Sequence, residues 1–412
     1  MSRAWVVAVA LGAACTTAPP APSPPSLDAI AEGYVKASLQ LWQHNPDLVD
    51  DWRGPKSWDA KPRIPVQPIL DRIEALQRDL EASSRSGSDP DRRNYLQAQL
   101  RSLHLVAKRL LGESLPFDRE ADEFLGVATP PVNESTVSSA RDTLSRELPG
   151  TAPLVDRLAT FRKRFVVAKA RENAVMTTAL AACRAETEKV VTLPGDEHVE
   201  FEFDLAVGFD GYANYEGNHR TRISIERVTD FDITRALHLA CHEGYPGHHV
   251  QFVLIDDILA GRNKWAEFQL APNFGRHLLI TEGAAETATA IAFPPDARRR
   301  VYRDQLFPAA GFPVGDVDRL VRVEELVNTL EPVIADTVRA YLDNSLTRAK
   351  AVDRLRDEAL TADPDGLLDF AEKHRTRVLA YPAGKMLVDR LLAKDGLAGL
   401  VRLFAETPFR IQ

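Results

Sequence analysis

Cysteine is scarce in this sequence, which has three cysteines and three methionines among 412 residues. Cys15 lies in an amino-terminal segment of unusual composition, so only Cys183 and Cys241 remain for the rest of the chain. Two cysteines are too few for the disulfide framework that stabilises small secreted proteins. We therefore expect the fold to depend on its hydrophobic core, which a content of 44% hydrophobic residues can supply.

The sequence also lacks an excess of positive charge. Lys and Arg total 51 against 59 Asp and Glu, which gives a formal net charge of -8. This balance argues against a nucleic-acid-binding protein, because such proteins concentrate Lys and Arg on one face. There is no repeat at a fixed period, so a solenoid is not expected. The composition indicates a globular, enzyme-sized chain.

The amino terminus has the features of an export signal. Arg3 provides a positive charge, Ala4–Ala14 form an apolar run too short to span a bilayer, and small residues precede Cys15. We predict a lipoprotein-like signal peptide over residues 1–14, with a lipid on Cys15 as the only membrane contact; ordinary secretion is the alternative. A Pro-rich linker over residues 15–26 follows. The expected location is the periplasmic side of a bacterial cell envelope.

Helical periodicity dominates the remaining chain. Apolar residues recur at steps of three and four over residues 69–80 and 96–110, which predicts two amphipathic helices. The same pattern predicts a helix from about Leu154 to Ala182, and several more between residues 317 and 404. We therefore predict a mainly α fold.

One region departs from the helical pattern. Val199–Leu205 and Thr221–Ile225 alternate apolar and polar residues, with glycines between them, and predict a small sheet. An edge of this sheet could pair with an extended peptide, or the strands could form a hairpin that only covers the core.

Histidines gather directly after this region. Four of the ten histidines, His238, His242, His248 and His249, lie within twelve positions, and Glu243 adjoins the second. A hydrolytic zinc site needs neutral imidazole and carboxylate ligands, an open position for water, and a carboxylate that accepts the proton of that water. His242 and Glu243 supply one ligand and one base.

The spacing of the second histidine differs from the HExxH pattern, in which four residues separate two ligands on one helical face. His242 and His248 are six apart, which in a straight helix puts them about 240° apart in azimuth and about 9 Å apart along the axis. Pro246 interrupts helical hydrogen bonding and Gly247 tolerates unusual dihedrals. The zinc hypothesis therefore requires a bend at Pro246 and Gly247.

Other assignments of the histidines stay open at this point. His238 and His242 have true i, i+4 spacing and could bind a metal by themselves. His249 could replace His248 as a ligand, or support a ligand by a hydrogen bond. The histidines could also be satisfied core or surface residues, an explanation better suited to a lone residue than to this group.

A third ligand is expected from the segment around Glu282 and Glu286, which are also i, i+4 neighbours. Carboxylates in so apolar a segment need partners if they are buried. One could bind zinc while the other orients a ligating histidine. Alternatively, Glu282 could simply favour a helix start, where a carboxylate meets the positive end of the helix dipole.

These segments resemble a bacterial family of lipoproteins of unknown function with three signatures: HExxPGHHxQ, an EGWA-type segment and YxxGK. Residues 242–251 match the first signature throughout, residues 282–285 approximate the second, and Tyr381–Lys385 match the third. The family is similar in outline to Taq-type zinc carboxypeptidases and other gluzincins. Two positions depart from it: Ala284 replaces a Trp and Thr289 replaces a second Glu.

The resemblance implies a set of roles. His242, His248 and Glu282 would hold Zn²⁺, Glu243 would act as general base, and Tyr381 would donate to the developing oxyanion. It also implies a helical gluzincin-like fold over residues 27–412, with a small sheet beside the active-site helix and a catalytic core at about 195–412.

The leading functional hypothesis is a zinc metallopeptidase in which metal-activated water attacks a peptide carbonyl of a peptide or protein substrate. Arg375 and Arg377 are candidates to bind a substrate carboxylate, which would suit a carboxypeptidase. The alternatives are a catalytically silent protein that binds peptides or envelope partners, and a zinc hydrolase of non-peptide amides. Glu243 favours an enzyme, because a silent relative needs no base beside a ligand.

Overall fold

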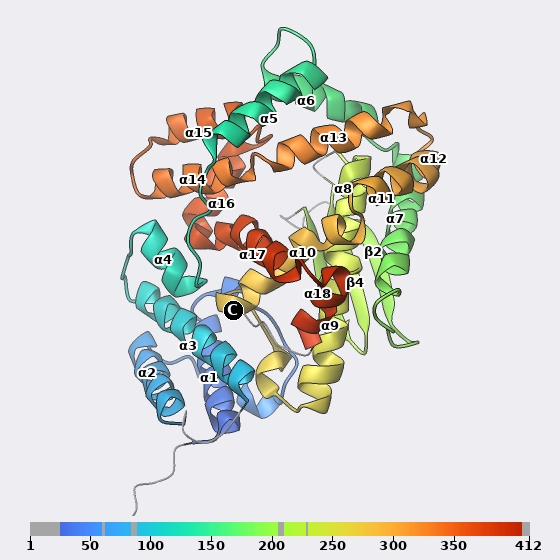
Figure 1. Ribbon diagram of the computed structural model, residues 1–412. Coiled ribbons are helices and arrows are strands. Elements are labelled where there is room, and N and C mark those ends of the chain that lie inside the picture. Colours follow the sequence, from blue (N-terminus) through green and yellow to red (C-terminus); the bar gives the residue numbers. More distant parts are fainter. Residues whose placement is uncertain (1–24, 60–61, 84–88, 205–209, 228–229, 406–412) are drawn as a thin grey trace, which may run out of the picture.

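A computed structural model of the chain describes residues 25–59, 62–83, 89–204, 210–227 and 230–405 (Figure 1). The predicted signal peptide, Cys15 and most of the predicted linker lie outside these ranges.

The described chain is mainly helical with a small sheet, which confirms the predicted fold class. None of its helices is long and apolar enough to cross a membrane. The α-helices are α1 (Leu27–Trp42), α2 (Val66–Ala82), α3 (Pro90–Leu110), α4 (Phe117–Phe124), α5 (Glu134–Glu147), α6 (Leu154–Arg162), α7 (Glu172–Thr187), α8 (Ile233–Leu239), α9 (His248–Leu254), α10 (Gly275–Ala292), α11 (Pro295–Val301), α12 (Phe307–Ala310), α13 (Val317–Asn328), α14 (Glu331–Leu342), α15 (Arg348–Asp357), α16 (Pro364–His374), α17 (Pro382–Leu392) and α18 (Gly396–Ala405).

The prediction of one helix from Leu154 to Ala182 is wrong. The chain leaves the helical conformation between α6 and α7, where Val166 forms a β-bridge with Asp232. The N–H of Val167 donates to the carbonyl of Phe231 at 2.9 Å. Two consecutive β-branched residues favour this extended pairing over a helix, although the apolar spacing is helical on both sides.

The strands form two small sheets. They are β1 (Val49–Trp52), β2 (His198–Asp204), β3 (Gly211–Gly217), β4 (Arg220–Glu226) and β5 (Leu270–Pro272). In the larger sheet, β4 lies between β2, its parallel neighbour, and β3, its antiparallel neighbour. The alternating pattern predicted β2 and β4 but missed β3, which is an edge strand of this sheet.

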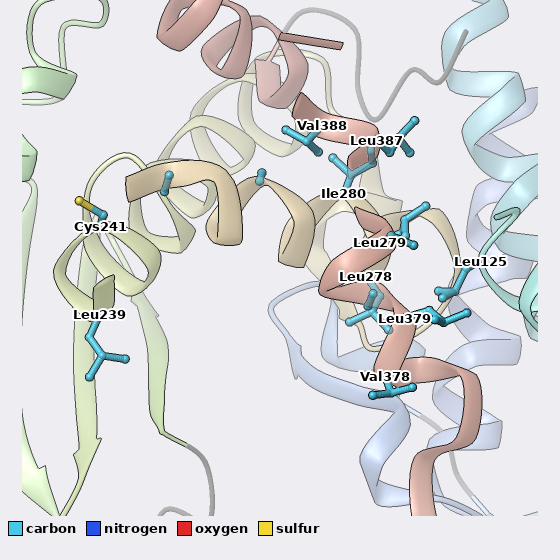
Figure 2. Packing of buried hydrophobic residues seen from close by; sticks show 14 of the residues in the cluster. Leu125, Leu239, Cys241, Leu278, Leu279, Ile280, Val378, Leu379, Leu387 and Val388 are labelled. Carbon is cyan, nitrogen blue, oxygen red and sulfur yellow. The ribbon is translucent and has the colours of Figure 1, made fainter. Parts of the chain in front are cut away.

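Helix α10 runs through the middle of the molecule (Figure 1) and is buried along most of its length. Figure 2 shows its residues Leu279 and Ile280 beside Leu387 and Val388 of α17. The two helices meet at glycines: a Cβ atom added to Gly283 would lie 2.2 Å from the carbonyl carbon of Gly384. This contact allows the two backbones to approach closely.

An alanine at position 283 should therefore destabilise the protein. The Gly283→Ala variant places a methyl group against the backbone of α17, and overpacking of this kind costs about 1–3 kcal/mol of unfolding free energy. Urea denaturation measures the loss. Gly315→Ala is the matched control, because a Cβ there has no atom within 4 Å. Equal stability of the two variants would show that α10 and α17 can separate freely.

The two cysteines of the described chain form a disulfide. Cys183 of α7 is bonded to Cys241, which precedes His242, and their sequence separation is 58. Both residues are fully buried. The expectation that the fold depends on its core alone is therefore wrong. Two cysteines cannot make a disulfide framework, but they form one cross-link between α7 and the histidine segment, residues 238–249.

Candidate metal centre

The histidine segment begins as a capped helix and ends in a break. Asp232 caps α8 by accepting from the N–H groups of Thr234 at 2.8 Å and Arg235 at 3.0 Å. After α8 the chain continues as the wider π-helical turn η6 (Ala240–Gly244), which contains His242 and Glu243. It leaves the helix at Tyr245, and α9 begins at His248. The helix is thus interrupted where the six-residue spacing requires it.

Gly247 permits this break because only a residue without a side chain fits there. A Cβ atom on Gly247 would lie 1.9 Å from the carbonyl oxygen of His242 and 2.5 Å from that of Cys241. The N–H of Gly247 also donates to the carbonyl of Cys241 at 3.0 Å. The chain therefore folds back onto the preceding turn, and His248 returns towards His242.

The structure brings His242, His248 and Glu282 together. The ring centroids of the two histidines are 4.8 Å apart. Oε2 of Glu282 lies 3.8 Å from Nε2 of His242 and 3.9 Å from Nε2 of His248. Tetrahedral zinc ligands at bond lengths near 2.1 Å are spaced about 3.4 Å apart. Both distances from Glu282 are within about 0.5 Å of that spacing, and all three ligand atoms lie within 4.8 Å of one another, so the donor set fits the ion.

Electrostatics also suit a cation. Burial lowers the pKa of His242 well below its usual value and the pKa of His248 to about 4, so both imidazoles are neutral and able to bind a metal. Burial raises the pKa of Glu282 to about 8. Glu282 occupies the eighth position of α10, so the alternative that it merely favours a helix start is wrong.

Glu243 faces the same space as the three predicted ligands. Its Oε1 lies 3.9 Å from Nε2 of His242. The backbone N–H of Ala213 in β3 donates to its carboxylate. Burial and the nearby carboxylate of Glu282 raise the pKa of Glu243 well above its usual range.

A second group of side chains shares His242. His238, His242 and Glu286 also offer ligand atoms within 4.8 Å of one another. Oε1 of Glu286 lies 3.5 Å from Nδ1 of His242, on the opposite side of the ring from Glu282. Glu286 is thus placed to orient the imidazole, while His238 keeps open the alternative of a separate metal pair.

His249 points away from the three predicted ligands. Its Nδ1 lies 2.8 Å from Oγ1 of Thr221 and its Nε2 lies 2.8 Å from Oε2 of Glu197. The hydroxyl of Tyr245 donates to the same Glu197 oxygen at 2.7 Å. His249 and Tyr245 flank the helix break, so this buried network attaches both sides of the break to the sheet. It does not supply a metal ligand.

A cavity of about 660 Å³ opens onto the ligand group. Tyr381 lines it, between η11 (Arg375–Ala380) and α17, and the charge of Glu282 is the main cause that raises its pKa. Arg377 lines the cavity as well. Arg375 does not: its Nε donates to Oε2 of Glu120 at 2.6 Å, so it is a structural residue.

Neither departure from the family signatures lies in the cavity wall. Ala284 is fully buried on α10, and Thr289 is further along the same helix. The described residues that line the cavity include neither of them.

One wall of the cavity comes from the beginning of the chain, which sequence analysis did not connect with the site. Strand β1 pairs with β5, with Asp51 opposite Ala271, and β5 leads into α10. This pairing places Asp50 and Arg53 in the cavity. Asn273, which follows β5, donates to Asp50. A pairing over more than two hundred residues has no local sequence signal.

No protein-family model matches the chain, and no curated protein matches it in sequence. A solved structure described as a putative lipoprotein from Colwellia psychrerythraea has a TM-score of 0.49 and 18% identity, over 84% of this chain and 68% of that one. Another, described as CHT, has a TM-score of 0.44 and 12% identity, over 94% and 92%.

Proposed function

We propose that this protein is a zinc-dependent peptidase that hydrolyses peptide bonds. The observation that carries the proposal is the convergence of Nε2 of His242, Nε2 of His248 and Oε2 of Glu282 beside the buried carboxylate of Glu243. Two neutral imidazoles and one carboxylate are a common ligand set of hydrolytic zinc, which leaves a position open for water. Zinc bound there would polarise a carbonyl group and lower the pKa of water to about 7.

The residues of the chain have distinct tasks in this proposal. Glu243 accepts the proton of the attacking water and returns it to the leaving amine, a task suited to a base whose pKa lies above the ordinary carboxyl range. Tyr381, in the wall of the same cavity, donates a hydrogen bond to the oxyanion of the tetrahedral intermediate. Its raised pKa keeps the phenol protonated for that purpose.

Strand β3 supports a peptide as the substrate. It pairs only with β4 among the described strands, and its residues 211–215 line the cavity. The free edge of a strand offers backbone groups to an extended chain. A peptide laid along β3 would pass in front of Glu243, because Ala213 of this strand already contacts that carboxylate.

A digestion experiment tests the proposal. Purified protein should contain one zinc ion per chain, and it should cleave members of a peptide pool, as read by mass spectrometry. Chelation should abolish cleavage, and added zinc should restore it. Protein without stoichiometric zinc, or cleavage that survives chelation, would overturn the proposal.

Two substitutions separate the two candidate ligand groups. Glu286→Gln should weaken zinc affinity about 10- to 100-fold, because it removes the carboxylate that orients His242. His238→Ala should leave the affinity unchanged. Competition with a chromophoric chelator measures both constants. If His238→Ala loses the ion, His238, His242 and Glu286 form the metal site instead.

We further propose that the chain is exported and held at the envelope by a lipid on Cys15. The support is the apolar run and small residues before this cysteine. Cys15→Ala should move the protein from the membrane fraction to the soluble fraction, because a lipid chain supplies the affinity for the bilayer. Thr17→Ala is the control, since it changes a linker residue close to Cys15 and leaves the cysteine in place. Unchanged membrane retention of Cys15→Ala would exclude the lipid.

A further inference from the structure

The cavity contains one arginine, Arg377, whose charge acts on Asp50 and Glu282 from a distance. Among the described residues, Arg377 forms no ion pair, and its Nε is buried without a hydrogen bond. The other Arg and Lys side chains of the lining are paired: Arg53 donates to Asp51 at 2.9 Å and lies over the ring of Tyr215. Lys373 is 2.9 Å from Asp47. Arg377 is half-buried, and a buried N–H without an acceptor is costly, so this guanidinium is available for an anion.

Arg377 belongs to the same wall as the proposed oxyanion donor. It lies in η11, four residues before Tyr381, and both side chains line the cavity. Its positive charge acts on both Glu282 and Tyr381, because it opposes the rise in the pKa of each group. At the rise of a 3₁₀-helix, four residues cover about 8 Å. An extended peptide covers that distance in two to three residues.

We propose that Arg377 binds the free α-carboxylate of a peptide substrate, so that hydrolysis removes two or three residues from the carboxyl end. This inference rests on the proposed peptidase function. A guanidinium matches a carboxylate through two parallel hydrogen bonds, which fixes both the position and the direction of the bound chain. Peptides without a free carboxyl terminus would not supply this carboxylate to Arg377, which explains selection against them.

The test compares N-acetylated hexapeptides of one sequence that end in a carboxylate or in an amide. Zinc-loaded wild-type protein should cleave the acid near its carboxyl end, with a kcat/KM on the order of 10- to 100-fold above that of the amide. Arg377→Gln should remove this difference, mainly through a higher KM for the acid. Lys373→Gln, which removes a paired cation of the same cavity, should keep it. A merely structural role of Arg377 would lower both rates and leave their ratio unchanged.

The outcomes separate the subsite from the proposed function. Equal cleavage of acid and amide, or an acid preference that survives Arg377→Gln, overturns the subsite and leaves the peptidase proposal intact. If neither peptide is cleaved, titration calorimetry measures how tightly zinc-loaded Glu243→Gln protein binds the acid and the amide. Tighter binding of the acid, lost when Arg377→Gln is added, supports the subsite while the peptidase proposal fails. Equal binding of the two peptides overturns both.

Discussion

The Glu243→Gln variant should hydrolyse peptides about 10³-fold more slowly than the wild type and still bind one zinc ion. Glutamine has the shape of glutamate but cannot accept a proton, and a positioned general base contributes about 10²- to 10⁴-fold to the rate. Glu243 is 4% exposed, so bulk water cannot readily replace it as the base. Peptide cleavage assays at saturating zinc, with metal content measured on the same sample, check the prediction.

His248→Ala is the companion variant, because it should lose the metal as well as the activity. The pair distinguishes a ligand from a base in one experiment. Full activity of Glu243→Gln would show that another group accepts the proton. Loss of zinc from Glu243→Gln would instead make Glu243 a ligand, which the position of its Oε1 3.9 Å from Nε2 of His242 could permit after a small movement.

Loss of the disulfide should lower the free energy of unfolding by about 4 kcal/mol, the value that loop-closure entropy gives for a loop near this length. Cys183→Ser opens a cross-link with a sequence separation of 58. The enclosed segment includes the three-stranded sheet and α8. Urea denaturation under non-reducing conditions measures the change.

The control for this prediction is Cys15→Ala, which leaves the cross-link intact and should unfold at the wild-type urea concentration. Cys183→Ser with Cys241→Ser should match the single variant, because either substitution opens the same loop. Wild-type protein that unfolds at the same urea concentration with and without reductant would contradict the prediction.

The periodicity of apolar residues was sufficient to predict those helices and strands that bury one face and expose the other. The apolar steps over residues 69–80 and 96–110 correspond to α2 and α3, and the alternating segments correspond to β2 and β4. Strand β3 was missed because its sequence, GYANYEG, follows no strict alternation. Positive φ angles at Asn218 and His219 show that a tight turn joins it to β4, and the Gly-Asn pair there was the available signal.

The candidate site was predictable only in its local part. The Pro-Gly pair required a helix break, because six residues cannot bring two side chains to one face of a straight helix. The residue pattern alone left the choice between Glu282 and Glu286 open, since residues four apart share a face, and only the family resemblance favoured Glu282. In the structure, Glu282 approaches Nε2 of His242, whereas Glu286 approaches Nδ1 of the same ring. The position of Asp50 in the cavity wall was not predictable, and neither was the absence of an ion pair at Arg377 among the described residues. Both depend on contacts between residues that are far apart in the sequence.

The cavity has a consequence for the order in which the protein matures. Its walls combine β1, near the start of the described chain, with Tyr381, near its end. Synthesis runs from the amino terminus, so Tyr381, the proposed oxyanion donor, leaves the ribosome after the other described residues of the cavity. A nascent or truncated chain that ends before Tyr381 would carry the proposed ligands without a complete site. The proposed activity would thus arise only after residue 381 has been made.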